Sequence, residues 1–113
     1  MGFDEYQKEA ARCDLFEATR DLNQPGFVAK VFGICEEAGE VSGKFKKIIR
    51  DKEGKISDED REEIVKELGD VLWYVASIAR YMGVNLSYVA DKNMEKLLGR
   101  LERGTLHGKG DNR

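Results

Sequence analysis

Hydrophobic positions recur at helical spacing along most of the chain and predict four helices. The first is expected to begin at about Asp4, a residue type that caps helices, and to end at the break formed by residues 23–26. The second follows Gly26 and ends near Arg50, before the polar residues 51–54. Its apolar stripe consists of Ile34, Ala38, Val41, Phe45 and Ile48.

Two further helices are predicted in the second half of the chain. The third begins after Ser57, whose side chain is suited to cap it, and ends just before Gly83, a residue that favours the position past a helix. The fourth begins at residues 85–87 and ends near Arg103. Residues 104–113 contain three glycines and no apolar periodicity, which is typical of a strap or a mobile arm.

These elements indicate an all-α fold, with residues 1–113 forming one domain as a four-helix bundle-like protomer. A chain of this length buries a limited fraction of its surface, so a second copy would add stability. Residues 71–82, VLWYVASIARYM, are apolar on nearly every side, and a helix that is hydrophobic all round is covered all round. We therefore expect a homodimer or homotetramer. The alternative is a central helix in a monomeric bundle, with Trp73 at its edge.

Composition and charge exclude several classes of protein. Charged residues make up 36% of the chain, but the net charge of −3 lacks the basic face that general nucleic-acid binding requires. No apolar run is long enough to span a membrane, and the N-terminal residues are too charged for a signal peptide. Cys13 and Cys35 lack the spacing of metal ligands and are expected to be reduced thiols in a cytoplasmic protein, with a disulfide between them as the alternative.

Two of the predicted helices each carry two carboxylates three residues apart, which places both on one helical face. Glu37 and Glu40 lie in the segment EEAGE, and Glu67 and Asp70 lie in the segment ELGD. Each pair lies at the shoulder of an apolar stripe, whereas Glu36 points nearly opposite to its stripe. If the two shoulders meet, like charges converge and need a cation. Carboxylates with open coordination positions suit Mg²⁺, with Mn²⁺ as an alternative, whereas zinc would favour His or Cys.

A solvated acidic face is the alternative for either pair, because acids at this spacing are common in a chain so rich in them. Gly39 and Gly69 favour a site. Each lies in mid-helix directly before the second acid of its pair, where glycine costs about 1 kcal/mol relative to alanine. Such glycines are consistent with close backbone approach or with space for a ligand.

The segment EEAGE at residues 36–40, followed after 26 residues by ELGD, resembles the EExxE…ExxD signature of MazG-type, all-α nucleoside triphosphate pyrophosphohydrolases. The resemblance covers most of the chain, from EYQKEAAR through ADKNMEKLLGR to GKGDNR. It implies hydrolysis of a nucleoside or deoxynucleoside triphosphate to the monophosphate and pyrophosphate. The residues that match the family's Mg²⁺ ligands are Glu37, Glu40, Glu67 and Asp70. Glu36 matches the first acid of the signature and is expected to act from behind the ligands or across a subunit boundary.

A basic row on the fourth predicted helix is the candidate phosphate-binding surface. Lys92, Lys96, Arg100 and Arg103 recur at helical spacing, which places them on one face beside Asn93. The segment KLLGR, with Asn93 three residues before Lys96, resembles the family's phosphate-contacting stretch. Arg suits bidentate contact with phosphate. A solvated helix surface is the alternative.

The leading interpretation is an Mg²⁺-dependent enzyme that controls the nucleotide pool. The alternatives are a non-catalytic helical regulator that binds a nucleotide or a partner protein, and another phosphohydrolase that uses the same site on a signalling nucleotide. His107, the single histidine, is expected to be exposed, and Lys44 is expected to be solvated. Trp73 and Tyr74 are expected in the core or a dimer interface rather than stacked on a base.

Overall fold

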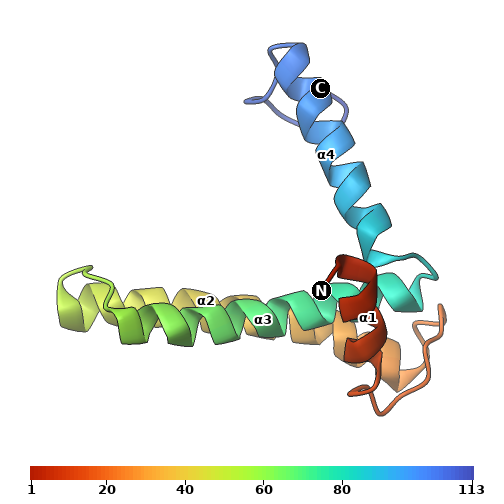
Figure 1. Cartoon of the computed structure of the whole chain (residues 1–113), viewed down its shortest axis with the longest axis horizontal. Helices are drawn as coiled ribbons and strands as arrows, with labels where there is room; N and C mark the ends of the chain where they lie inside the picture. The colour runs from red at the N-terminus through yellow and green to blue at the C-terminus, as the bar shows by residue number, and fades with distance from the viewer.

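The computed structural model describes residues 1–113 as four helices without a strand, which confirms the all-α prediction (Figure 1). The helices are α1 (Phe3–Ala11), α2 (Pro25–Lys52), α3 (Asp58–Tyr81) and α4 (Leu86–Glu102). The predicted bounds of the last three agree closely with these. None of the helices combines the length and the apolar character that crossing a bilayer requires.

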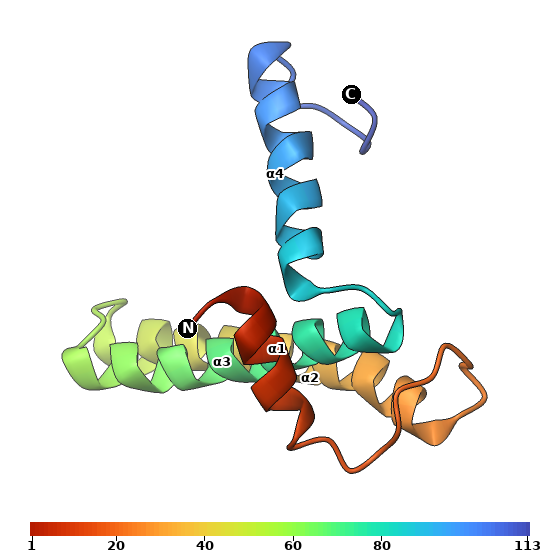
Figure 2. The ribbon, with the colours of Figure 1, turned by 45° about the vertical axis from the view of Figure 1, so that its right-hand side comes forward.

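Helices α2 and α3 form a long antiparallel hairpin, side by side in Figures 1 and 2. α3 begins with a capping box, in which Ser57 Oγ accepts from the Asp60 N–H (3.1 Å) and the Asp60 carboxylate accepts from the Ser57 N–H (3.0 Å). Lys52 also donates to Asp60 at 2.7 Å, and these contacts, Lys52 first, lower the pKa of Asp60 to about 2. Toward the other end, Gly33 lets α2 approach Tyr74, because a Cβ at Gly33 would overlap the Tyr74 ring.

The prediction for the first helix was wrong about its length. α1 ends at Ala11, and residues 12–24 are irregular. Asp14 and Asp21 each accept a hydrogen bond from the main-chain N–H two residues ahead, which stabilises local turns in place of helix. Apolar residues in this segment follow helical spacing only loosely, so no continuous buried face stabilises a longer helix.

Asp4 was expected to cap α1, but Gly2 is the N-cap and Asp4 lies in the first turn. The Asp4 carboxylate instead accepts hydrogen bonds from the N–H (2.9 Å) and the hydroxyl (2.7 Å) of Ser87, in the first turn of α4. A carboxylate at the positive end of a helix is favourable. Asp4 therefore fastens the start of α4 to α1.

Gln7, a buried residue of α1, forms the joint between α4 and the rest of the chain. Its amide nitrogen donates to the carbonyl oxygens of Ala76 and Val84, both at 3.1 Å, and its Oε1 accepts from the N–H of Leu86 at 3.0 Å. α4 contacts α1 and α3 but not α2, and it projects away from the hairpin (Figure 2). The protomer is therefore more open than four helices packed side by side.

A buried ion cluster holds residues 12–24 against the hairpin. The Asp14 side chain, 1% exposed, accepts hydrogen bonds from Arg80 and Tyr81, both at 2.6 Å, and pairs with Lys30 at 3.0 Å. Burial alone would raise the pKa of Asp14, but its hydrogen bonds, led by that from Tyr81, outweigh burial and hold the pKa below its ordinary value. Sequence reasoning missed this cluster, because neither Asp14 nor Lys30 belongs to a recognisable motif.

We predict that Asp14→Ala lowers the free energy of unfolding at pH 7 by about 3 kcal/mol, because it leaves a buried lysine without its carboxylate. A carboxylate with a lowered pKa contributes stability above its unfolded value of 3.8 and loses that contribution as the pH falls through the folded pKa. The difference from the unsubstituted chain should therefore shrink below about pH 4. Urea denaturation at several pH values measures it.

The matched control is Asp21→Ala, in the same irregular segment, where the carboxylate is exposed and bonds to Asn23. It should cost less than about 1 kcal/mol. Equal losses in the two variants would show that the Asp14 cluster does not anchor the segment.

Candidate metal centre

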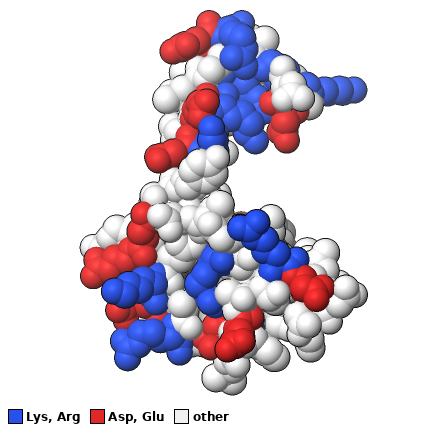
Figure 3. Space-filling model, turned by 90° about the vertical axis from the view of Figure 1, so that its right-hand side faces the viewer, with Lys and Arg blue, Asp and Glu red and all other residues white.

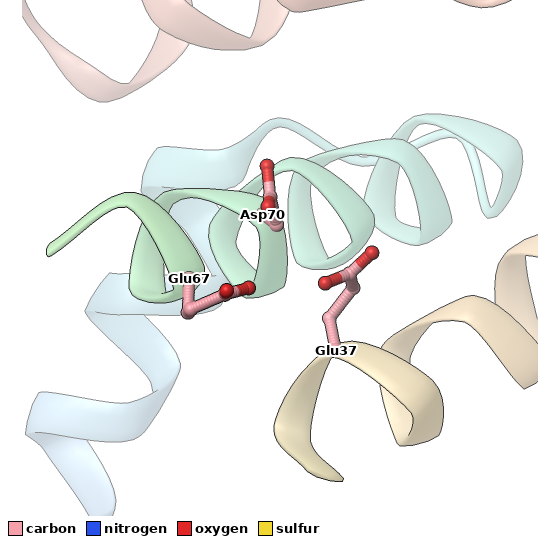
Figure 4. Close-up of side chains that lie close together, drawn as sticks. All are labelled: Glu37, Glu67 and Asp70. Carbon is pink, nitrogen blue, oxygen red and sulfur yellow. The ribbon is translucent and has the colours of Figure 1, made fainter. Parts of the chain in front are cut away.

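Three of the predicted acids meet between α2 and α3. Glu37 projects from α2 and Glu67 and Asp70 project from α3, and one carboxylate oxygen of each lies within 4.8 Å of the others (Figure 4). The antiparallel hairpin explains the meeting, because each step along α2 is matched by a step backwards along α3. Gly33 faces Tyr74, and one helical turn further Glu37 faces Asp70.

The electrostatics of the cluster are those of converging like charges. Burial, and then the charges of Asp70, Glu36, Glu67 and Glu40, raise the pKa of Glu37. Burial and the charge of Glu37 likewise raise the pKa of Tyr74 on α3. Convergence of like charges costs free energy that a bound cation removes.

Glu40 and Glu36 are not brought into the cluster. Both are exposed, and neither joins the set of carboxylates within 4.8 Å. Glu40 is nevertheless one turn from Glu37 on α2, level with Glu67 in the hairpin register, so its side chain starts on the same side. The helical position of Glu36 predicts that its side chain points away from the cluster, although its charge contributes to the raised pKa of Glu37.

Lys44 is the cation nearest to the acids. Its Nζ lies 3.8 Å from Glu67 Oε1 and 3.9 Å from Glu63 Oε2, and its side chain is half-buried. The sequence prediction of a solvated Lys44 was therefore wrong. The register of the α2–α3 hairpin could have predicted this contact, since Lys44 faces Glu63 once the two helices are aligned.

The predicted basic row lies on the part of α4 that projects from the hairpin, where Figure 3 shows Lys and Arg side chains gathered. Lys92 pairs with Glu95 at 3.2 Å, and Lys96 pairs with Asp111 at 3.3 Å. Arg100 is buried, and Asn93 is exposed. Within one chain, the row and the acidic cluster are therefore separate surfaces.

Other candidate residues have simple environments. His107 is exposed, as predicted. Trp73 is half-buried and its indole N–H donates to the carbonyl oxygen of Ala10 at 3.1 Å, so it packs between α3 and α1. Cys13 and Cys35 are unpaired and exposed, which excludes a disulfide between them in this structure.

The donor set suits a hard divalent cation. All three converging groups are carboxylates, no His or Cys lies among them, and Asp70 is exposed while Glu37 and Glu67 are half-buried. Oxygen ligands on one side and access on the other match the way Mg²⁺ binds proteins, with positions left for water and phosphate. The chemistry of the donor set therefore fits a divalent metal ion.

Comparison with known proteins agrees with this chemistry. The sequence model of the MazG nucleotide pyrophosphohydrolase domain matches residues 29–104, which include both acidic pairs and the basic row. The "Gene 37 protein" of Mycobacterium phage L5 is 42% identical over 114 residues, a span that covers the whole of both chains. No solved structure matches the chain. Because the domain model covers more than half of the sequence, the chain belongs to the MazG nucleotide pyrophosphohydrolase family.

Proposed function

We propose that this protein is an Mg²⁺-dependent nucleoside triphosphate pyrophosphohydrolase that acts in control of the nucleotide pool. The observation that carries the proposal is the convergence of Glu37, Glu67 and Asp70 in a chain of this family. The reaction converts a nucleoside or deoxynucleoside triphosphate and water to the monophosphate and pyrophosphate. A water oxygen forms a bond to the α-phosphorus, and the bond from that phosphorus to the bridging oxygen of the β-phosphate breaks.

The residues of the cluster have defined tasks in this proposal. Glu37, Glu67 and Asp70 hold Mg²⁺ (or Mn²⁺), which when bound supplies positive charge against the phosphate oxygens and activates water. Glu40, exposed and one turn from Glu37, is free to complete the ligand set or to accept the proton of the attacking water. Glu36 acts from behind the ligands or across a subunit boundary.

We further propose that the protein works as a homo-oligomer, with a dimer as the smallest unit. Only 14 of 113 residues are buried in one chain. Two rows of large apolar side chains are exposed at helical spacing, one on α3 (Val65, Leu68, Leu72) and one on α4 (Met94, Leu98, Leu101). Exposed apolar rows of this kind mark protein interfaces. A hollow of about 260 Å³ at the joint of α4, lined only by apolar residues, adds to this surface.

Association also addresses the separation of the basic row from the acids. α4 makes no contact with α2 in one chain, and its basic end projects from the hairpin (Figure 1). A second copy that covers the apolar face of the hairpin is able to bring its own α4 beside the acids. The proposed site is then composite, with carboxylates from one subunit and phosphate-binding cations from the other.

The first test of the function is a panel of nucleoside and deoxynucleoside triphosphates with Mg²⁺, assayed separately for pyrophosphate and orthophosphate. We expect pyrophosphate and a monophosphate in equal amounts. Glu67→Gln and Asp70→Asn should each lower the rate by more than about 100-fold. Substitution of residues that only hydrogen-bond to metal ligands already costs about 10- to 100-fold in metal affinity or activity, and these two residues are proposed as the ligands themselves.

The control for these variants is Glu62→Gln, an exposed position of α3 that pairs only with Arg61 and should leave the rate unchanged. Absence of pyrophosphate from every substrate would contradict the enzyme and leave the nucleotide-binding regulator. Release of orthophosphate alone would favour another phosphohydrolase. Pyrophosphate release that survives both acid substitutions would contradict the site.

A second test measures the metal without catalysis. The raised pKa of Glu37 means that the folded chain holds this proton more tightly than the unfolded chain, so stability falls as the pH rises past the ordinary value of 4.5. At pH 7, Mg²⁺ at 100 times its dissociation constant should stabilise the unsubstituted protein by about 2.7 kcal/mol. Glu37→Gln should raise the melting temperature without metal and abolish most of the Mg²⁺ effect.

Glu62→Gln is again the control, and its response to Mg²⁺ should equal that of the unsubstituted protein. A full Mg²⁺ response in Glu37→Gln would exclude Glu37 as a ligand. A lower melting temperature of metal-free Glu37→Gln would contradict the repulsion inferred from the converging carboxylates.

A third test asks whether the site is composite. Glu67→Gln and Lys96→Glu, each inactive alone, should recover activity when the two variants are co-expressed. If acids and cations come from different subunits, each mixed dimer keeps one intact site, so random 1:1 pairing gives about a quarter of normal activity. If both come from one chain, each site carries one defect and no activity returns.

The matched control is co-expression of Glu67→Gln with Glu37→Gln, which leaves no subunit with an intact acidic cluster and should restore nothing in either arrangement. If sedimentation shows a monomer at micromolar concentration, both the oligomer and the composite site are overturned. The metal site is tested separately, by the effect of Mg²⁺ on stability.

A further inference from the structure

The segment after α4 folds back beside the end of that helix (Figure 2). We call residues 104–113 the strap. Gly104 (φ 69°) and Gly110 (φ 82°) adopt the left-handed conformation that reverses the chain at low cost. The Arg113 guanidinium donates to the carbonyl oxygens of Thr105 (3.0 Å), Leu106 (2.9 Å) and Gly110. One side chain thus gives the strap a defined shape.

The strap places oxygen atoms on the basic row of α4. The Asp111 carboxylate lies 3.3 Å from Lys96 Nζ and 3.2 Å from Arg100 Nη2. Arg103 donates to a main-chain oxygen of Arg113 at 2.6 Å. Three of the four cations of the row therefore contact strap oxygens, much as they would contact the oxygens of a bound phosphate chain.

The two sides of this contact differ in how firmly they are held. The Arg100 side chain is 5% exposed and also donates to the Gly110 carbonyl oxygen at 3.2 Å, whereas the Asp111 side chain is 81% exposed. Exposed ion pairs contribute little to stability, so the Asp111 contact is readily exchanged for another anion. The carboxylate is therefore the more accessible and the more easily replaced of the two partners.

The site also has unused binding capacity. Arg100 Nε is buried and has no hydrogen-bond partner, although a guanidinium nitrogen that is withdrawn from water normally bonds to an acceptor. Beside the strap, an open cavity of about 830 Å³ lies between α4 and residues 111–112. Its charged lining consists of three cations, Lys92, Lys96 and Arg103, and two acids, Glu95 and Asp111. A polyphosphate that takes the place of Asp111 would bring acceptor oxygens to Arg100 and more negative charge than one aspartate.

We propose that the strap occupies an anion site on α4, with Asp111 in the position of a phosphate group between Lys96 and Arg100, and that a polyphosphate displaces it. The strap is then an internal competitor that holds the basic row together when no anion is bound. That the natural anion is the triphosphate of a nucleotide rests on the proposed function, but the competition itself does not.

The test is binding of inorganic tripolyphosphate to the full chain, without Mg²⁺ and at low ionic strength, by isothermal titration calorimetry. Asp111→Asn removes the competing charge but keeps the size of the side chain. It should bind tripolyphosphate about three- to tenfold more tightly than the unsubstituted protein, the range that one or two exposed ion pairs imply. Catalysis is not involved, so an inactive enzyme would not obscure the result.

The matched control is Asp91→Asn, which removes the same charge from an exposed position of α4 that makes no ion pair. It isolates the contact from the general gain in positive charge. Equal affinities of Asp111→Asn and Asp91→Asn would overturn the competition. Weaker binding by Asp111→Asn would overturn it too, by showing that the strap is a permanent part of the anion site, and no binding to any variant would overturn the anion site.

Limited proteolysis gives an independent readout. Lys109 is an exposed trypsin site inside the strap. Displacement predicts that tripolyphosphate speeds cleavage after Lys109 in the unsubstituted protein, and that Asp111→Asn is cleaved faster even without the anion. Cleavage that tripolyphosphate slows or leaves unchanged would contradict displacement.

Discussion

The antiparallel packing of α2 against α3 is the constraint on which the candidate site depends. Gly33 allows the backbone of α2 to approach the Tyr74 ring, and the capping box of Ser57 and Asp60 fixes where α3 begins. Between these two points the register leaves no freedom, because packed helices slide only at the cost of their interdigitated side chains. One turn from Gly33, Glu37 is therefore held against Asp70. The acids meet because of contacts that lie outside the acidic segments.

The hairpin carries charge in two contrasting ways. At Asp14, a nearly inaccessible carboxylate is surrounded by Lys30, Arg80 and Tyr81, so its pKa is held low and the cluster ties an irregular segment to the fold. Around Glu37, carboxylates face one another and the pKa is raised. The first arrangement is complete within the chain, whereas the second stores repulsion that a cation relieves. That contrast separates a structural ion cluster from a binding site.

The open shape of the protomer likewise leaves surfaces that one chain does not cover. α4 stands away from the hairpin on the Gln7 joint, with apolar side chains exposed along it and along α3. Its basic row is neutralised in part by the strap, through Asp111. Exposed apolar rows are typical of protein interfaces, and cations paired with an exposed carboxylate are typical of an anion-binding surface. In the proposed enzyme the partners of these two surfaces are a second subunit and a polyphosphate.

Local patterns in the sequence were enough for much of the fold. Helical periodicity and the capping residues Ser57 and Gly83 predicted α2, α3 and α4, because these helices are long and amphipathic and their signals lie within a few residues of each boundary. The spacing of the acids also placed each pair on one helical face. Local patterns failed for α1, where the aspartates of residues 12–24 bond to their own backbone.

Only the tertiary structure decided which acids meet, since proximity between α2 and α3 follows from their register and not from spacing along either helix. It admitted Glu37, Glu67 and Asp70 to the cluster, left Glu40 outside, and placed Lys44 beside Glu67. It also decided that the basic row of α4 lies apart from the acids and that Asp111 covers it. The sequence by itself determined the helices and the chemistry that they carry. The direction in which α4 leaves the Gln7 joint depends on contacts between residues more than 60 positions apart, and so do the bonds from Arg80 and Tyr81 to Asp14. No local pattern encodes such contacts.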